Sequence, residues 1–468
     1  MGIKKNLFRS AAKRLCPLLP LVLAPALACG FPGLSPHHLD PGYWIAKAGR
    51  DAPVPEDAIG RQNAALVADD AAVHDLATLP SRVAGDALRD MVEGLSAPPS
   101  GTLYDAEGAV VGRRDLAAIV RNAAADRIPA AGVAPRWGMV VRRADMRSFP
   151  TTLRVFRSAG DRDIDRFQET ALFPGTPLAL LHESRDSQWW FALSPLYAAW
   201  IEKRHVAEGE RGAVLGYPRR SPFLVVTGAE ERTVYTPERP ELSELVLDMG
   251  VRVPLLQDWP ANALVNGQHP LGAWVVELPV RDASGTLAFA PALLPRSAEV
   301  SRGYLPLTRA SLIAQAFRFL GERYGWGHSY GARDCSGFVS EVYRSFGILL
   351  PRNTRDQAVS PAFSRTAFGD EDDRAARIAV LRSLDVGDLV YIPGHVMMVV
   401  GQEPEGPYVI HDTTGTGLVG ADGTLARVAL NGVVVTPLLP LYADADTPYV
   451  DRITSIQRIW PQRTRSTP

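Results

Sequence analysis

Cys335 is the only cysteine beyond residue 29, and it lies between Asp334 and Ser336. Asp is a residue type that caps helix N-termini, so Cys335 is expected in the first turn of a helix. Unpaired N–H groups and the helix dipole favour an anion there, and a thiolate is a nucleophile. The pattern therefore predicts nucleophilic chemistry at Cys335. The helix itself is predicted by apolar residues that recur at three- and four-residue intervals, namely Phe338, Val339, Val342, Tyr343 and Phe346.

A cysteine nucleophile needs a base that is distant in sequence but close in the fold. Segments 384–401 and 407–415 are rich in Val, Ile and Tyr and punctuated by Gly and Pro, which predicts two strands. We expect His395 to open the first strand and His411 to close the second. On neighbouring antiparallel strands, His395 would face Cys335 while His411 holds its far ring nitrogen. Such an arrangement provides a nucleophile, a base and an orienting group.

The region 309–440 resembles the NlpC/p60 family of papain-like cell-wall cysteine peptidases. The resemblance implies that Cys335 is the nucleophile, His395 the general base and His411 the polar third member. The matching residues are Tyr324 and Trp326 of YGWG, DCSGFV at 334–339, LPRNTRDQ at 350–357, Gly387–Asp388, His395–Val396 and His411. Many members carry a second Gly where this chain has His328, which we interpret as a loop residue.

The same resemblance implies where the substrate would bind. Tyr324 would lie beside the nucleophile, and Asp334 and Ser336 would line the substrate pocket. In relatives that carry an SH3 barrel, a tyrosine at the position of Tyr197 reaches toward the catalytic cleft. Such relatives often require a free L-Ala N-terminus, and Asp334 is one candidate carboxylate for its ammonium group.

The resemblance further implies a peptidoglycan hydrolase. Its substrate would be the L-Ala-γ-D-Glu-diaminopimelate stem peptide, cut between D-Glu and the diamino acid through a thioester. No metal or other cofactor is expected. Three alternatives stay open: an N-acetylmuramoyl-L-alanine amidase, an acyltransferase, and a wall-binding protein without catalysis.

The N-terminus predicts export. Residues 1–14 are basic and residues 15–28 almost wholly apolar, which is typical of a signal peptide and too short for a spanning helix. The run Ala26–Leu27–Ala28–Cys29 resembles a lipobox, so we expect lipid attachment at Cys29. Plain cleavage after Ala28 is the alternative, because Ala26 stands where Leu is preferred. The protein is thus expected in the periplasm or cell envelope, anchored to a membrane.

Strand and helix patterns predict a multidomain chain. The peptidase domain is expected to have an α+β papain-like layout with helices on one side of a sheet. The N-terminal domain is expected to be mainly helical or irregular and to wrap the others, starting with an extended tether at 30–46. The predicted segments are a signal peptide at 1–28, the N-terminal domain at 29–135, SH3-like barrels at 136–217 and 218–300, and the peptidase domain at 301–468.

Composition limits the partners. The 468 residues are 46 % hydrophobic, enough for several cores. No internal disulfide is expected, since Cys16 would leave with the signal and Cys29 would be acylated. A net charge of −1 argues against a nucleic-acid partner, which would call for a basic surface. We expect a monomer.

Overall fold

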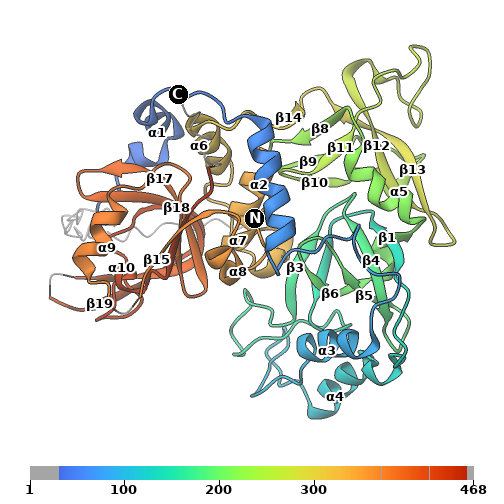
Figure 1. Ribbon diagram of the computed structural model, residues 1–468, viewed down its shortest axis with the longest axis horizontal. Helices are drawn as coiled ribbons and strands as arrows, with labels where there is room; N and C mark the ends of the chain where they lie inside the picture. Colours follow the sequence, from blue (N-terminus) through green and yellow to red (C-terminus); the bar gives the residue numbers. More distant parts are fainter. Residues whose placement is uncertain (1–30, 370, 421, 461–468) are drawn as a thin grey trace, which may run out of the picture.

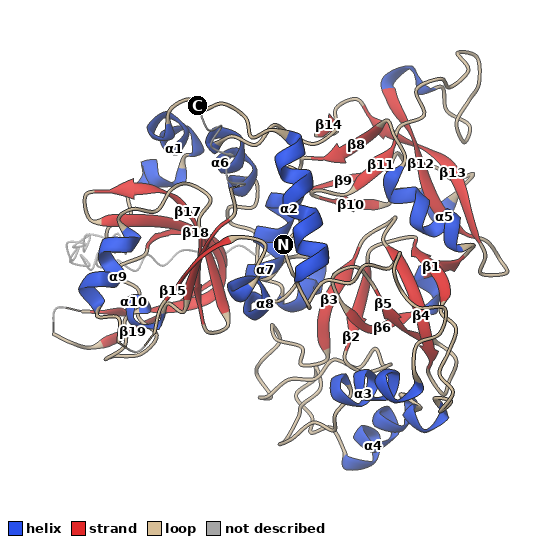
Figure 2. Cartoon of the chain, viewed as in Figure 1, coloured by secondary structure: helices blue, strands red, loops and turns tan. Residues whose placement is uncertain are grey.

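The computed structural model describes residues 31–460, except 370 and 421. Figure 1 shows a C-terminal lobe on one side and two β-rich lobes on the other, with helices α2 (Glu56–Asp69), α7 (Cys335–Arg344) and α8 (Thr354–Val359) between them. Figure 2 shows that strands dominate all three lobes, with the N-terminal helix α1 (Pro41–Ala48) at the C-terminal lobe and α3 (Gly85–Leu95) and α4 (Arg113–Asn122) at the lobe that contains β2 to β6 (residues 144–202). Cys16 and Cys29 lie outside the described residues, so the signal peptide and the lipid anchor stay predictions. None of the helices within the described ranges is long and apolar enough to cross a membrane.

The N-terminal region is helical and touches two lobes. Its helices are α1 (Pro41–Ala48), α2 (Glu56–Asp69), α3 (Gly85–Leu95) and α4 (Arg113–Asn122). On the C-terminal lobe, Asn63 of α2 donates to the Gly347 carbonyl over 2.7 Å. On the first barrel, Trp200 donates through Nε1 to Ser96 Oγ over 3.0 Å.

The expected tether at 30–46 is wrong for its described part. Residues 36–39 form a 3₁₀ turn, and α1 follows at once. Trp44 is completely buried and packs against Tyr408, with ring centroids 5.3 Å apart. Its ring fills the space over Gly401, where a Cβ would come within 2.6 Å of it. Burying an aromatic of this size fixes the segment to the C-terminal sheet.

The first β-rich lobe is one seven-stranded sheet in the order β3-β2-β6-β5-β4-β1-β7. Trp190 and Trp200 are buried in it, as expected for a small barrel core. The strands are β1 (Arg136–Val140), β2 (Ala144–Arg147), β3 (Gln168–Leu172), β4 (Pro177–Glu183), β5 (Trp189–Leu193), β6 (Ala198–Glu202) and β7 (Val206–Glu208).

The second β-rich lobe consists of three small sheets around one apolar core, with α5 (Arg211–Gly216) beside them. The sheets are β11-β8-β14, β10-β9 and the long hairpin β12-β13. The strands are β8 (Phe223–Val226), β9 (Glu230–Arg232), β10 (Val246–Asp248), β11 (Arg252–Pro254), β12 (Ala273–Arg281), β13 (Leu287–Pro295) and β14 (Val300–Arg302).

The C-terminal lobe has the expected α+β architecture, with a six-stranded sheet in the order β15-β20-β16-β17-β18-β19. The strands are β15 (Ser364–Ala367), β16 (Leu389–Ile392), β17 (His395–Glu403), β18 (Gly406–Val419), β19 (Leu425–Pro437) and β20 (Ser455–Arg458). The helices are α6 (Arg309–Phe317), α7 (Cys335–Arg344), α8 (Thr354–Val359), α9 (Arg374–Leu381) and α10 (Tyr449–Arg452). The expectation that the helices lie on one side of the sheet is wrong, because α6 and α7 pack on one face and α9 and α10 on the other. Both faces of β17 are apolar, so both need a cover.

Candidate active site

The predicted nucleophile begins a helix, as the sequence indicated. Helix α7 starts at Cys335, and the side chain of its N-cap, Asp334, accepts a hydrogen bond from the Gly337 N–H over 2.8 Å. The apolar face of α7 is fully buried, which locks the helix against the sheet. Cys335 itself is 5 % exposed. The local sequence therefore holds one sulfur rigidly at a helix start.

The thiol is less acidic than a helix start alone predicts. Burial raises the pKa of Cys335 to about 12, and the Asp334 carboxylate adds to the increase. The residue that caps the helix thus also brings a negative charge close to the sulfur. The resting enzyme holds a neutral thiol, so the reaction needs a base to remove its proton as it attacks.

The two predicted histidines lie side by side on antiparallel strands. His395 opens β17, as expected, and His395 Nε2 lies 2.8 Å from His411 Nδ1. The expectation that His411 closes its strand is wrong, because β18 continues to Val419 through a bulge between Thr413 and Gly415. The interior position gives His411 a partner on each side, since its Nε2 lies 3.0 Å from Thr436 Oγ1 on β19.

Two arrangements of protons are consistent with this chain of contacts, and one of them leaves a ring nitrogen of His395 free to accept a proton. If His395 Nε2–H donates to His411 Nδ1, then His411 Nε2–H donates to Thr436, and His395 Nδ1 is left as an acceptor. Burial lowers the pKa of His395 to about 4, so the ring is neutral at pH 7. A neutral imidazole with a free Nδ1 is suited to act as a general base.

The sulfur lies beside the turn that carries His395. Cys335 Sγ is 4.0 Å from the carbonyl oxygen of Gly394 and 3.7 Å from Thr354 Oγ1. Within the described residues Cys335 and His395 share no hydrogen bond. Catalytic hydrogen bonds are often long or poorly aligned before substrate binds.

Asp334 and Ser336 are placed beside the nucleophile, but their polar atoms are already engaged. Asp334 Oδ2 accepts from Arg352 Nη2 over 2.8 Å and from the Gly327 N–H over 3.0 Å. Ser336 Oγ accepts from Arg352 Nη1 and lies 3.2 Å from Asp334 Oδ1. Burial would raise the pKa of Asp334, but Arg352 outweighs it and lowers this pKa to about 2. Asp334 therefore serves as cap and counter-ion, with little capacity left for a substrate ammonium.

Tyr324 lies on the edge of the same sheet. Its N–H donates to the Asn431 carbonyl on β19, and the following Gly325 donates to the carbonyl of Arg333, two residues before Cys335. Burial raises the pKa of the Tyr324 hydroxyl, and the Cys335 and Asp334 charges raise it further. The neutral hydroxyl makes no hydrogen bond to any of the described residues, so it is available to a ligand.

The first barrel builds the other side of the site. Arg352 Nε donates to Thr170 Oγ1 of β3 over 2.6 Å, which ties the barrel to the 352–356 segment. The Tyr197 hydroxyl donates to Glu169 Oε2 over 2.5 Å, and both side chains feel the charge of Arg352. Burial raises the pKa of Glu169, with the Tyr197 hydrogen bond acting against it. A carboxylate and a phenol thus meet next to the nucleophile helix.

Residues 321–422 match the family model NlpC/P60, and residues 154–202 match an SH3 domain of the SH3b1 type. The C-terminal domain belongs to the NlpC/P60 family. This family comprises cysteine peptidases that act on peptidoglycan. The match to the SH3b1 type covers β3 to β6, with Glu169 on β3 and Tyr197 in the turn just before β6.

One solved structure shows the same fold over most of the chain. The NlpC/P60 endopeptidase from Photobacterium damselae subsp. piscicida has a TM-score of 0.70 and 16 % identity, covering 89 % of this chain and 96 % of that one. An NlpC/P60 family protein from Bacillus cereus has a TM-score of 0.46 and 18 % identity, covering 69 % of this chain and 100 % of its own. No curated protein gives a significant match.

Three NlpC/P60-domain neighbours of the site were missed from the sequence, namely Arg352, Asp412 and Thr436. Arg352 lies inside a matching motif but carried no assigned role. Asp412 is completely buried beside His411, and burial raises the pKa of its carboxyl to about 9, so it is neutral at pH 7. Polar residues inside otherwise apolar strands were the available signal for Asp412 and Thr436.

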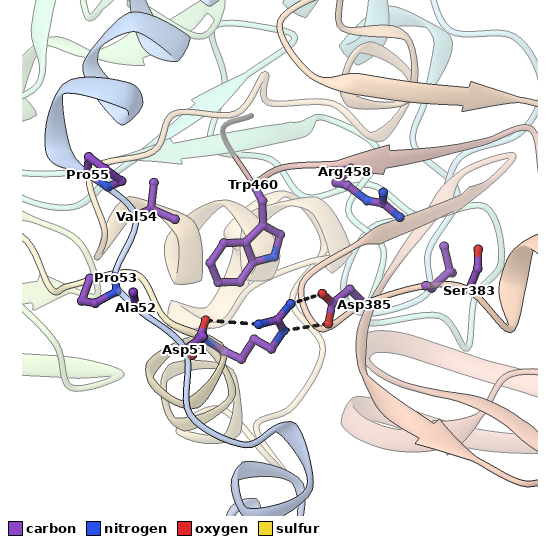
Figure 3. Close-up of a pocket in the computed structure, with 11 residues that line it drawn as sticks. Asp51, Ala52, Pro53, Val54, Pro55, Ser383, Asp385, Arg458 and Trp460 are labelled. Atoms are coloured by element: carbon purple, nitrogen blue, oxygen red, sulfur yellow. Dashed lines mark hydrogen bonds and ion pairs between the residues drawn. The ribbon is translucent and has the colours of Figure 1, made fainter. Parts of the chain in front are cut away.

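A separate pocket of about 420 Å³ lies elsewhere (Figure 3). Arg309 pairs there with Asp385 and Asp51, next to Trp460. Asp385 precedes β16 whereas His395 follows it, so this pocket and the histidines occupy opposite ends of that strand. None of Cys335, His395 and His411 lines it.

Proposed function

We propose that this protein is a γ-D-glutamyl–diaminopimelate endopeptidase acting on peptidoglycan stem peptides. The observation that carries the proposal is the chain from His395 through His411 to Thr436, with the Cys335 thiol next to the turn before His395. When the His395 proton is on Nε2, that chain leaves Nδ1 unprotonated and able to accept the proton of the thiol. It is the arrangement that acyl transfer by a cysteine requires.

The reaction follows from these positions. His395 Nδ1 takes the thiol proton as Sγ attacks the γ-carbonyl carbon of D-Glu. The C–N bond then breaks, and His395 returns the proton to the departing amine of diaminopimelate. Water attacks the resulting thioester while His395 takes its proton, which releases the γ-carboxylate and restores the thiol.

The oxyanion would be held by the backbone N–H of Cys335 and the hydroxyl of Tyr324. The first N–H groups of a helix have no partner within the helix, and the Tyr324 hydroxyl is free and neutral. One such donor contributes roughly 3 kcal/mol to transition-state stabilisation.

The proposed specificity for a free L-Ala N-terminus rests on the barrel. Asp334 is neutralised by Arg352, whereas Glu169 has only the Tyr197 hydroxyl as a hydrogen-bond partner among the described residues. A substrate ammonium would donate hydrogen bonds to the partly buried Glu169 carboxylate and to the Tyr197 oxygen. Glu169 and Tyr197, rather than Asp334, are therefore the proposed ligands of this ammonium group.

The setting of the reaction is also a proposal. Export through the 1–28 signal and acylation of Cys29 would place the enzyme, as a monomer, at a membrane facing the wall. Phe31, two residues after Cys29, already packs against the core of the C-terminal lobe. The anchor would thus hold the peptidase domain close to the lipid surface. Labelling by a radioactive fatty acid should mark the wild type and not Cys29→Ser, whereas an unlabelled, soluble wild type would exclude the anchor.

The test is product analysis by mass spectrometry. The substrates are L-Ala-γ-D-Glu-diaminopimelate and the same peptide carrying N-acetylmuramic acid on L-Ala. We expect L-Ala-γ-D-Glu and free diaminopimelate from the first, slow or no cleavage of the second, and no products with Cys335→Ala. Release of intact tripeptide from the muramyl substrate would instead identify an amidase.

A further inference from the structure

His328 occupies the position where related sequences have a second glycine after WG. Its backbone φ is +64°, in the left-handed region that favours glycine. A bulky residue is rarely held in that conformation unless its surroundings fix it. The ring is 4 % exposed and packs over Gly337 of α7, where a Cβ would come within 2.5 Å of it. The expected loop residue is therefore a buried part of the structure around Cys335.

Two oppositely charged partners hold the His328 ring. Its Nε2 lies 3.1 Å from Glu341 Oε1, and its Nδ1 lies 3.2 Å from Arg352 Nη2. A carboxylate only accepts and a guanidinium only donates, so His328 must be neutral, with its proton on Nε2. The Asp334 carboxylate, which is bound to Arg352, is the other charge that acts on the ring. Arg333 and Arg344 form ion pairs with Glu341.

These contacts connect the start of α7 to its middle. Arg352 binds the N-cap Asp334 and also Ser336, the residue after the nucleophile. Glu341 lies two turns along the same helix. The His328 ring bridges Arg352 and Glu341. It thereby fixes one N–H group of the guanidinium that neutralises Asp334.

We propose that His328 is a positioning residue for the nucleophile: it holds Arg352 against Asp334 and Ser336 and thereby fixes the first turn of α7 around Cys335. The residue touches neither the sulfur nor a substrate. Without the ring, Arg352 is less constrained, and the Asp334 charge near the sulfur is less well neutralised. The thiolate then forms less readily and is worse aligned.

The thiol can be tested without any substrate, so the result does not depend on the proposed endopeptidase activity. The measurement is the rate of alkylation of Cys335 by iodoacetamide between pH 6 and 9, read from the Cys335 peptide by mass spectrometry. Three variants are compared with the wild type. His328→Gly removes the ring and relaxes the backbone. His328→Asn tolerates the left-handed backbone but is too short to reach both partners, while His328→Gln can donate to Glu341 and accept from Arg352.

We expect alkylation to slow at least fivefold in His328→Gly and His328→Asn, and to return to within threefold of wild type in His328→Gln. The kcat for stem-peptide hydrolysis should fall at least tenfold in the first two variants, with KM changed less than threefold. The matched control is Tyr330→Gly, because Tyr330 has φ +62° in the same loop but is 48 % exposed. It should leave alkylation unchanged.

Thermal unfolding separates positioning from stability. A folded His328→Gly or His328→Asn with wild-type alkylation and kcat, differing only in melting temperature, would overturn the proposal. An equal loss in His328→Gln would do so too, because the paired hydrogen bonds would not be the cause. If His328→Gly does not fold, the same readouts in His328→Asn decide.

Discussion

The two sides of the site differ in how their polar groups are satisfied. On the NlpC/P60 side, His395, His411 and Thr436 form a neutral chain in which each group has its partner on an adjacent strand. On the barrel side, the partly buried Glu169 carboxylate has only the Tyr197 hydroxyl as a hydrogen-bond partner among the described residues. In the first group every side chain has a hydrogen-bond partner without any ligand. In the second, no cation in the part of the chain that the structure describes is hydrogen-bonded to Glu169, so a substrate ammonium group could take that place.

The largest effect should come from breaking the chemical side. Cys335→Ala and His395→Ala should each reduce kcat by several orders of magnitude. The nucleophile and the base act together, so removing either one abolishes the catalysis that both provide. Circular dichroism and melting temperature should stay close to wild type, since neither change removes much buried volume. Turnover above a trace in purified Cys335→Ala would show that another group is the nucleophile.

Breaking the binding side should change selectivity instead. Glu169→Gln should lower kcat/KM for the free L-Ala peptide about 10- to 100-fold, the cost of one charge-assisted hydrogen bond. The rate with the muramyl peptide should not fall. Tyr197→Phe is the matched control, because it keeps the ring and removes only the hydroxyl, so its effect on the same ratio should be smaller.

A Tyr197→Ala variant distinguishes cleft from core. Changed selectivity at a constant melting temperature would place the tyrosine in the subsite. Unchanged selectivity with a large loss of stability, of the roughly 3–5 kcal/mol typical of a deleted core aromatic, would return it to the barrel core.

A smaller effect is expected at the orienting end of the neutral chain. His411→Asn or His411→Gln should retain partial activity, because an amide can still accept from His395. Thr436→Val should cost less than either, since it removes only the second hydrogen bond. Steady-state kinetics on the free L-Ala peptide ranks the variants by their loss of kcat. A greater loss at His411 than at His395 would reverse their roles.

A further effect concerns stability rather than rate. The pKa of Asp412 is raised to about 9 in the folded protein from an ordinary 3.8, so its contribution is fully present below about pH 4 and is lost as pH rises toward 9. Asp412→Asn should therefore gain stability relative to wild type across that window, by up to about 1.4 kcal/mol per pH unit. Urea unfolding at pH 4.5, 6 and 8 measures the difference. A constant difference would mean that Asp412 is ionised in the folded state.

Local patterns in the sequence were sufficient for the chemical side. Helix spacing and the Asp334 cap located Cys335, and strand composition located His395 and His411. These signals lie within single elements. The acidity of the thiol was predicted in the wrong direction, because it depends on burial and on the Asp334 charge, neither of which helix position alone reveals.

The binding side could not be read in the same way. Glu169 and Arg352 are 183 positions apart in the chain, and only the packing of β3 on the peptidase domain brings their segments together. His328 was interpreted as a loop residue because its partners Glu341 and Arg352 meet only in the fold. The prediction of an extended tether was wrong for the same reason, because the contact of Trp44 with Gly401 of β17 forms only in the folded protein.

The account is tested most directly by trapping the acyl group on the enzyme. Wild-type protein is mixed with the free L-Ala tripeptide or the muramyl tripeptide, quenched in acid within the first turnover, and its peptides are weighed by mass spectrometry. We predict an L-Ala-γ-D-glutamyl thioester on Cys335 with the free peptide, and no adduct in His395→Ala. A muramyl adduct on Cys335 that forms as fast as the adduct of the free peptide, or an L-Ala-γ-D-glutamyl adduct on any other residue, would contradict the account.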